Sequence, residues 1–244
     1  MRNDYLTLYS GVDIVLKETN VIMHQPTIKE IAMLGEDNLF ILLQLINLDK
    51  DSVFGDETKA NEVSNLDIFL RLINVERQDL REVAAQFFTL LFKDYKVEFL
   101  EKEIKLTFNE QEDVVVSINK DSYEEVKKTI NDIFMIHSID ENASKDKATQ
   151  KLVAKFKKRK EILTKKKQNL QTDEEKMGEI PSAIASMVSV LSIGNNISTQ
   201  EILNYNYLRL CVDYKKLVTK VQYDSVDRYR IAGAKIEHDP DNWI

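Results

Sequence analysis

The length and composition of the chain describe a protein that folds around its own core. Its 244 residues, 43% of them hydrophobic and 31% charged, leave room for one large domain or two modest ones. Only 6 Gly and 3 Pro predict long helices and few tight turns. The single cysteine, Cys211, excludes an internal disulfide and a cysteine-built zinc site. Because no apolar run reaches the length of a membrane span and the first residues lack a signal-like apolar stretch, we expect a soluble cytoplasmic protein.

The net charge of −7 conceals a strong asymmetry along the chain. Residues 145–167 contain eleven Lys or Arg and two acidic residues, a net of +9, so the rest of the chain carries −16. We call residues 145–167 the basic arm. Three interpretations are open: first a solvated helix or linker, second a contact for a partner, and third a nucleic-acid-binding segment. Its one aromatic residue, Phe156, offers little for base stacking, and the acidic remainder of the chain also disfavours nucleic acid.

The first 47 residues predict a strand pair followed by a helix. Apolar and polar residues alternate within 11–25, and Pro26 marks the end of the extended segment. The run Thr27-Ile28-Lys29-Glu30 is a capping box, which predicts a helix to about Asn47. Gly35 lies on the apolar stripe of that helix, where it costs about 1 kcal/mol relative to alanine. We expect a close approach by another backbone there, or alternatively a bend.

The next ninety residues predict two helices, a small sheet and a third helix. Helical periodicity covers 66–73 and 80–92, after which the period changes to two over 97–108 and 114–118. This change predicts an antiparallel meander, joined in one sheet by the N-terminal strand pair. Ser122 and the glutamates after it predict the cap of a helix that turns its apolar face inward.

The C-terminal part predicts a helical hairpin. One apolar helix runs from Ile180 to about Leu191, and Gly194-Asn195 supplies residues that tolerate a left-handed cap. A second capping box, over 198–201, then opens a helix whose apolar stripe alternates spacings of four and three from Leu203 to Val221. The linker before the hairpin is polar over 168–178.

These elements predict an α+β fold that is mainly α-helical, with a small antiparallel β-sheet in the N-terminal half. We divide the chain into an N-terminal α+β domain over 1–139, a basic helical arm and linker over 140–178, and a helical C-terminal subdomain over 179–244. The alternative is a single domain in which the C-terminal hairpin packs back on the N-terminal helices.

No pattern in the sequence indicates catalysis, a cofactor or a metal. His24, His137 and His238 are far apart and none has metal-ligand spacing, and neither a phosphate-binding loop nor a nucleophile elbow is present. Acidic pairs such as Glu112-Asp113 are expected on a solvated surface. Cys211 lies beside the apolar stripe of the second C-terminal helix, so a packed small side chain is favoured over a nucleophile. We therefore assign no catalytic, cofactor-binding or metal-binding residue and expect no enzyme.

The C-terminal segment is rich in the aromatic residues that favour protein interfaces. Tyr207 and Tyr214 belong to the apolar stripe and fit a core role equally well, whereas Tyr205, Tyr223 and Tyr229 lie partly off it. The candidate partner-binding residues are Tyr205, Tyr207, Tyr214, Tyr223, Tyr229 and Trp243.

The two ends of the chain resemble one known family. The stretch from His24 to Ile31, followed by Gly35-Glu36, is similar to the tail assembly chaperones of long-tailed, siphovirus-like bacteriophages. The order that follows is also similar: a lysine-rich segment, an apolar helix, a helix with periodic Tyr and Leu, then Ala232-Gly233 and the final Pro-x-x-Trp at 240–243. The likeness spans most of the chain, but these motifs are loose and describe packing more than chemistry.

The resemblance implies a non-enzymatic role in the host cytoplasm. Such chaperones coat the tape measure protein, a very long helical chain with exposed apolar stripes, while tail tube subunits assemble around it. The expected partners are the tape measure protein and, second, the tail tube protein. Two alternatives remain open: a structural component of a virion tail or connector, and a nucleic-acid-binding regulator that uses residues 145–167.

Overall fold

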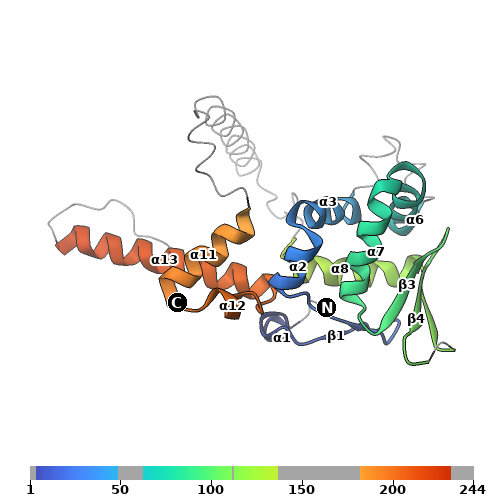
Figure 1. Ribbon diagram of the computed structural model, residues 1–244, viewed down its shortest axis with the longest axis horizontal. Coiled ribbons are helices and arrows are strands. Elements are labelled where there is room, and N and C mark those ends of the chain that lie inside the picture. Colours follow the sequence, from blue (N-terminus) through green and yellow to red (C-terminus); the bar gives the residue numbers. More distant parts are fainter. Residues whose placement is uncertain (1–3, 49–62, 112, 137–181, 232–244) are drawn as a thin grey trace, which may run out of the picture.

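The computed structural model describes residues 4–48, 63–111, 113–136 and 182–231. These residues form a mainly helical α+β protein with two small antiparallel sheets, which confirms the predicted fold class (Figure 1). Residues 140–178 lie outside the described residues, so the division into domains and the role of the basic arm stay predictions.

The N-terminal segment forms a short helix and a two-stranded sheet. Helix α1 (Tyr5–Ser10), which the sequence did not predict, precedes strands β1 (Ile14–Val15) and β2 (Ile22–Met23), which pair in antiparallel register. The prediction that this pair joins the later meander is wrong, because the two sheets are separate. After β2 the backbone turns to a helix end instead, where the His24 amide donates to the Leu91 carbonyl at 2.7 Å.

The predicted helix over 27–47 forms as two helices that meet at Gly35. The Thr27–Glu30 capping box opens α2 (Ile28–Leu34), and α3 (Glu36–Ile46) follows directly. Gly35 adopts φ 92° and ψ 132°, a conformation that L-residues rarely reach. The bend is therefore confirmed. The alternative of a close backbone approach is wrong, since the nearest atom to an added Cβ would be the Asn38 amide nitrogen, one turn further along the same chain.

The helices predicted over 66–73 and 80–92 both form, but a π-helical turn and a 3₁₀ turn lie between them. Helix α6 (Asn65–Arg71) begins at a Ser64 capping box and continues into a π-helical turn, η1 (Leu72–Glu76). A 3₁₀ turn, η2 (Gln78–Leu80), then leads into α7 (Arg81–Leu91).

The predicted meander is confirmed as a three-stranded antiparallel sheet in the order β3-β4-β5. Its strands are β3 (Tyr95–Phe99), β4 (Ile104–Phe108) and β5 (Val115–Ile118). Helix α8 (Lys120–Ile133) follows, but its cap is Asn119 and not Ser122. Ser122 is the reciprocal member of that capping box, so the sequence prediction placed the helix start three residues too late.

The C-terminal helices are α11 (Ala183–Asn195), α12 (Thr199–Ile202) and α13 (Tyr207–Ile231). The predicted second helix is interrupted between α12 and α13. The carbonyls of Leu203 and Tyr205 accept from the first amides of α2, Lys29 and Ile28, at 2.9 and 2.8 Å. Because these carbonyls are used between segments, they cannot extend a helical ladder, and Asn206 restarts the helix by accepting from the Arg209 amide at 2.8 Å.

The helical hairpin predicted for this region is wrong, because α11 and α13 run in the same general direction (Figure 1). The start of α11 is bonded to Glu36 at Ser182, and its end lies beside Leu217 in the middle of α13. The predicted glycine stop is also wrong. Asn196 is the left-handed cap of α11, with φ 53°, while Gly194 is helical and provides the space that Leu217 fills.

One hydrophobic core joins the N-terminal elements to the C-terminal helices. An aromatic cluster at its centre includes Phe69, Phe88 and Tyr123. The same contiguous core includes Ile184 and Leu191 of α11 and Leu210 of α13. The described C-terminal helices therefore share this core through α11 and the first half of α13, which contacts α1.

Candidate functional site

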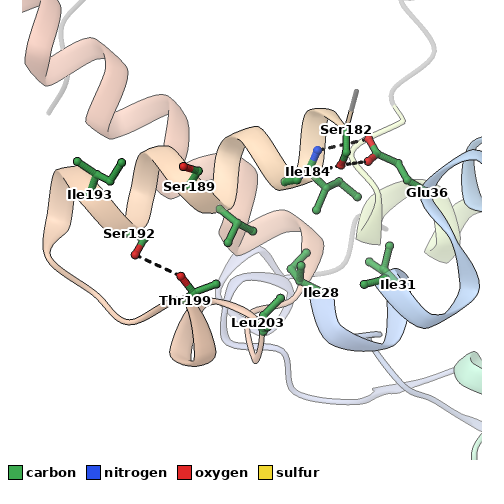
Figure 2. Close-up of a pocket in the computed structure, with 13 residues that line it drawn as sticks. Ile28, Ile31, Glu36, Ser182, Ile184, Ser189, Ser192, Ile193, Thr199 and Leu203 are labelled. Atoms are coloured by element: carbon green, nitrogen blue, oxygen red, sulfur yellow. Dashed lines mark hydrogen bonds between the residues drawn. The ribbon is translucent and has the colours of Figure 1, made fainter. Parts of the chain in front are cut away.

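An apolar groove lies between α2, α11 and α12 and is the best candidate for a functional site. It has a volume of about 710 Å³, and Figure 2 shows the side chains that line it. Helix α2 contributes a floor of aliphatic side chains, α11 forms one wall, and Thr199 and Leu203 form the other. The lining residues are Ile28, Ile31, Ala32, Glu36, Ser182, Ile184, Ala185, Val188, Ser189, Ser192, Ile193, Thr199 and Leu203.

Helix α11 is unusual because it contains no charged residue over its 13 residues. Its inner face is buried at Ile184, Val188 and Leu191, yet the described residues leave other apolar positions uncovered. Ile193 is 82% exposed and Val190 is 40% exposed. A helix that is apolar on most of its circumference normally has cover on more than one face. The groove side of α11 is thus a surface suited to a further apolar contact.

Glu36 closes one end of the groove by capping α11. Its carboxylate accepts from the Ala183 amide at 3.1 Å, from the Ile184 amide at 3.3 Å and from the Ser182 hydroxyl (Figure 2). A carboxylate at a helix N-terminus satisfies orphan amides and interacts favourably with the helix dipole. Glu36 is the first residue of α3 and directly follows the bend at Gly35. The bend therefore places the carboxylate that caps α11.

The hydroxyl groups of the groove do not make its interior strongly polar. Ser192 donates to the Ile197 carbonyl at 2.8 Å, and Thr199 donates to Ser192 at 3.4 Å (Figure 2). Ser182 already donates to Glu36. Because these three hydroxyl groups have partners within the fold, the groove presents mainly aliphatic surface and small side chains to a ligand.

The six aromatic residues proposed from the sequence do not gather into one surface, and none of the described ones lines the groove. Tyr205 is only 5% exposed and is covered by the Arg209 guanidinium, 3.7 Å from its ring centroid, so it is unavailable to a partner. Tyr207 is half-buried against Phe134, and Tyr214 is half-buried.

The remaining aromatic candidates lie further along α13 or beyond it. Tyr223 is half-buried, whereas Tyr229 is 62% exposed on the last turns of the helix. Trp243 lies outside the described residues. Sequence reasoning did not identify the groove, although the uncharged composition of α11 was a usable signal for it.

Cys211 and His24, two residues considered for catalysis or metal binding, are both partly buried and contact neighbouring side chains. Cys211 is half-buried, and burial raises the pKa of its thiol, which a hydrogen bond from Tyr207 only partly offsets. His24 lies between two carboxylates, with Nδ1 2.8 Å from Asp13 and Nε2 3.5 Å from Glu30. Across the described ranges no three His, Cys, Asp or Glu side chains converge as metal ligands. His137 and His238 fall outside those ranges.

None of the helices in the described part of the chain is both long and apolar enough to cross a bilayer. Comparison of the chain with protein-family models, with curated proteins and with solved structures found no match. The family resemblance therefore depends on the motifs in the sequence alone.

Proposed function

We propose that this protein is a non-enzymatic tail assembly chaperone of a long-tailed phage, and that its groove receives amphipathic helical segments of the tape measure protein. The observation that carries the proposal is the uncharged helix α11, which has one face in the core and a second face in an open apolar groove. The likeness of the two ends of the sequence to tail assembly chaperones supports the choice of partner.

The properties of the groove suit transient binding of a helix. Helix-in-groove recognition places the apolar stripe of one helix against aliphatic side chains of its partner. Small residues such as Ala32, Ala185 and Ser189 leave space for large side chains of an incoming helix. The net charge of −7 favours the solubility of a complex that would otherwise expose apolar stripes.

Co-expression with a tape measure fragment tests this proposal. The wild-type protein should raise the soluble fraction of the fragment, and Ala185→Glu, which places a charge in the groove from an exposed position, should remove most of that effect. Val190→Glu is the matched control, because Val190 is on the same helix but does not line the groove. A fragment that remains insoluble with the wild-type protein, or that Ala185→Glu still solubilises fully, would contradict the proposal.

Mass spectrometry of purified particles separates a chaperone from a structural component of the tail. A chaperone should be absent from the finished virion, since assembly of the tube displaces it. Presence in every particle at fixed stoichiometry would favour the structural role instead.

A further inference from the structure

The stripe of α13 that packs in the core continues past the point where α11 ends. Leu210 and Leu217 are buried, and Gly194, the next-to-last residue of α11, packs against Leu217. Four residues further on, Val221 is 55% exposed, and Ile231 at the end of the described helix is 87% exposed. In Figure 1 this half of α13 projects past α11, away from the N-terminal elements. The described part of the chain therefore leaves this half of the stripe open to a partner.

Four residues form the open half of the stripe, at spacings of three, four and three. In chain order they are Val221, Asp224, Arg228 and Ile231, so an aliphatic residue stands at each end and a charged residue at each inner position. These spacings are those of a heptad seam, and they continue the alternation of four and three that runs from Leu203 to Val221. In reverse the order is aliphatic, basic, acidic, aliphatic. The pattern is therefore complementary to its own reverse.

Two copies of this half of α13 match each other when they run antiparallel. A two-fold axis near Val226, the midpoint, brings Val221 against Ile231 of the second copy and Asp224 against Arg228 of the second copy. A two-fold interface uses the same patch on both copies and must therefore be self-complementary, as this one is. A parallel pair would instead bring Asp224 against Asp224 of the second copy and Arg228 against Arg228. Only the antiparallel order pairs opposite charges.

The other charges in this half of α13 leave the antiparallel pair close to neutral. Asp224 and Arg228 are both exposed, and neither forms an ion pair within the described residues. The Asp227 carboxylates of the two copies lie on one edge of the pair, but each is balanced by Arg230 of its own helix at 3.7 Å. Lys220 precedes the first pair of facing residues. With these five residues counted, each copy carries a net of +1, so charge selects the direction of pairing without strong repulsion.

We infer that the end of α13 from Val221 to Ile231 is a self-association surface, on which a second copy of this chain docks antiparallel. The second copy's helix takes over the stripe of α13 where α11 leaves it. The inference goes beyond the proposed function and does not rest on it, because none of the four stripe residues lines the groove.

The size of the surface predicts a weak dimer. The helices overlap over 221–231, about 16 Å at 1.5 Å per residue. A stable interface takes about 20–30 residues on each side, roughly twice the number available here. The aliphatic pairs at the two ends remove exposed Val221 and Ile231 from water, whereas the inner charged pairs add direction more than affinity. Association should therefore depend on concentration over the range that sedimentation measures.

Charge reversal tests the surface in the full chain. Sedimentation equilibrium from about 5 to 500 µM should show a monomer–dimer equilibrium. Asp224→Arg or Arg228→Asp alone should weaken it about tenfold or more, because each puts like charges together at both inner positions. An equimolar mixture of these two variants should regain the wild-type affinity as a heterodimer. Arg230→Asp, on the opposite side of the helix, is the matched control and should leave the affinity unchanged, and circular dichroism checks that all variants are folded.

Disulfide formation tests the direction of the pair. In a Cys211→Ser background, a chain with Val221→Cys should cross-link on oxidation to a chain with Ile231→Cys. The Val221→Cys chain alone should not cross-link, because the antiparallel pair keeps these two positions about 15 Å apart along the axis. Cross-linking of that chain alone would indicate a parallel pair and overturn the inference. A wild-type chain that stays monomeric at every concentration, or a mixture of the charge variants that fails to recover, would overturn it as well.

Discussion

The sharpest prediction concerns Gly194, where helix propensity and packing oppose each other. An alanine Cβ at this position would lie 2.4 Å from Leu217 Cδ2, 3.1 Å from Cδ1 and 3.2 Å from Cγ. Contact with three atoms of one side chain means that a small rotation of a methyl group cannot relieve the overlap. Leu217 itself is 9% exposed and packed in the core, which limits its movement.

The two contributions can be compared in magnitude. Replacing glycine by alanine within a helix raises the free energy of unfolding by about 1 kcal/mol when nothing else changes. The overlap with Leu217, whose side chain must shift out of its packed position, lowers it by about 1–3 kcal/mol. We therefore expect Gly194→Ala to destabilise the protein by about 1 kcal/mol, although the substitution improves the propensity of α11.

The Leu217→Ala background reverses the expected sign. That substitution alone should lower stability by about 2–3 kcal/mol, because it removes most of a buried side chain. With the leucine gone, Gly194→Ala meets open space and should stabilise by up to about 1 kcal/mol, a coupling of about 2 kcal/mol between the positions. Urea denaturation followed by circular dichroism measures the four proteins. If Gly194→Ala stabilises the wild-type chain, or has the same sign in both backgrounds, the packing argument is wrong.

Three further predictions concern polar contacts that hold the elements together. Glu36→Gln should destabilise by about 1–2 kcal/mol and accelerate hydrogen exchange in the first turn of α11, because a neutral amide is a weaker helix cap than a carboxylate; unchanged exchange there would refute the capping role. Burial would raise the pKa of Glu30, but hydrogen bonds from Lys93 and the α2 cap outweigh it and lower that pKa to about 2. This stabilisation, about 1–2 kcal/mol after solvent screening, should be present above pH 4.5 and be lost as the pH falls toward 2, and Glu30→Gln should remove that part of the pH dependence in acid titrations of stability. Asn206→Ala should destabilise by about 1–3 kcal/mol in urea, since its buried amide donates at 2.6 Å to a carbonyl of α1, and a change below 0.5 kcal/mol would exclude that role.

Local signals in the sequence predicted the elements whose stabilising contacts are close in sequence. The capping box at Thr27 and Glu30 forms as expected, because both partners are three residues apart and need no other part of the chain. The meander follows from its period of two, and its register pairs Phe99 with Ile104 across a short turn. The sequence also offered a bend at Gly35 as one of two expectations, because glycine reaches a φ of 92° without help from distant residues.

Contacts between distant segments decided what the sequence reasoning missed. The helix predicted from Leu203 onward is interrupted because α2, some 175 residues earlier, donates to the carbonyls of Leu203 and Tyr205. The periodic stripe continues through this break, so periodicity alone did not reveal it. Tyr205 appeared to lie off the stripe and available to a partner, but the backbone turn places it in the core beneath Arg209.

The candidate site shows the same division. The sequence by itself determined that α11 is an apolar helix and that α13 carries an apolar stripe, because both follow from residues three and four apart. Only the tertiary structure decided that α11 and α13 run in the same general direction, that Glu36 caps the first turn of α11, and that the end of α11 lies beside Leu217. These contacts join residues that are far apart in the sequence. Their free energy depends on how the side chains pack in three dimensions, and the periodicity of a sequence does not describe that packing.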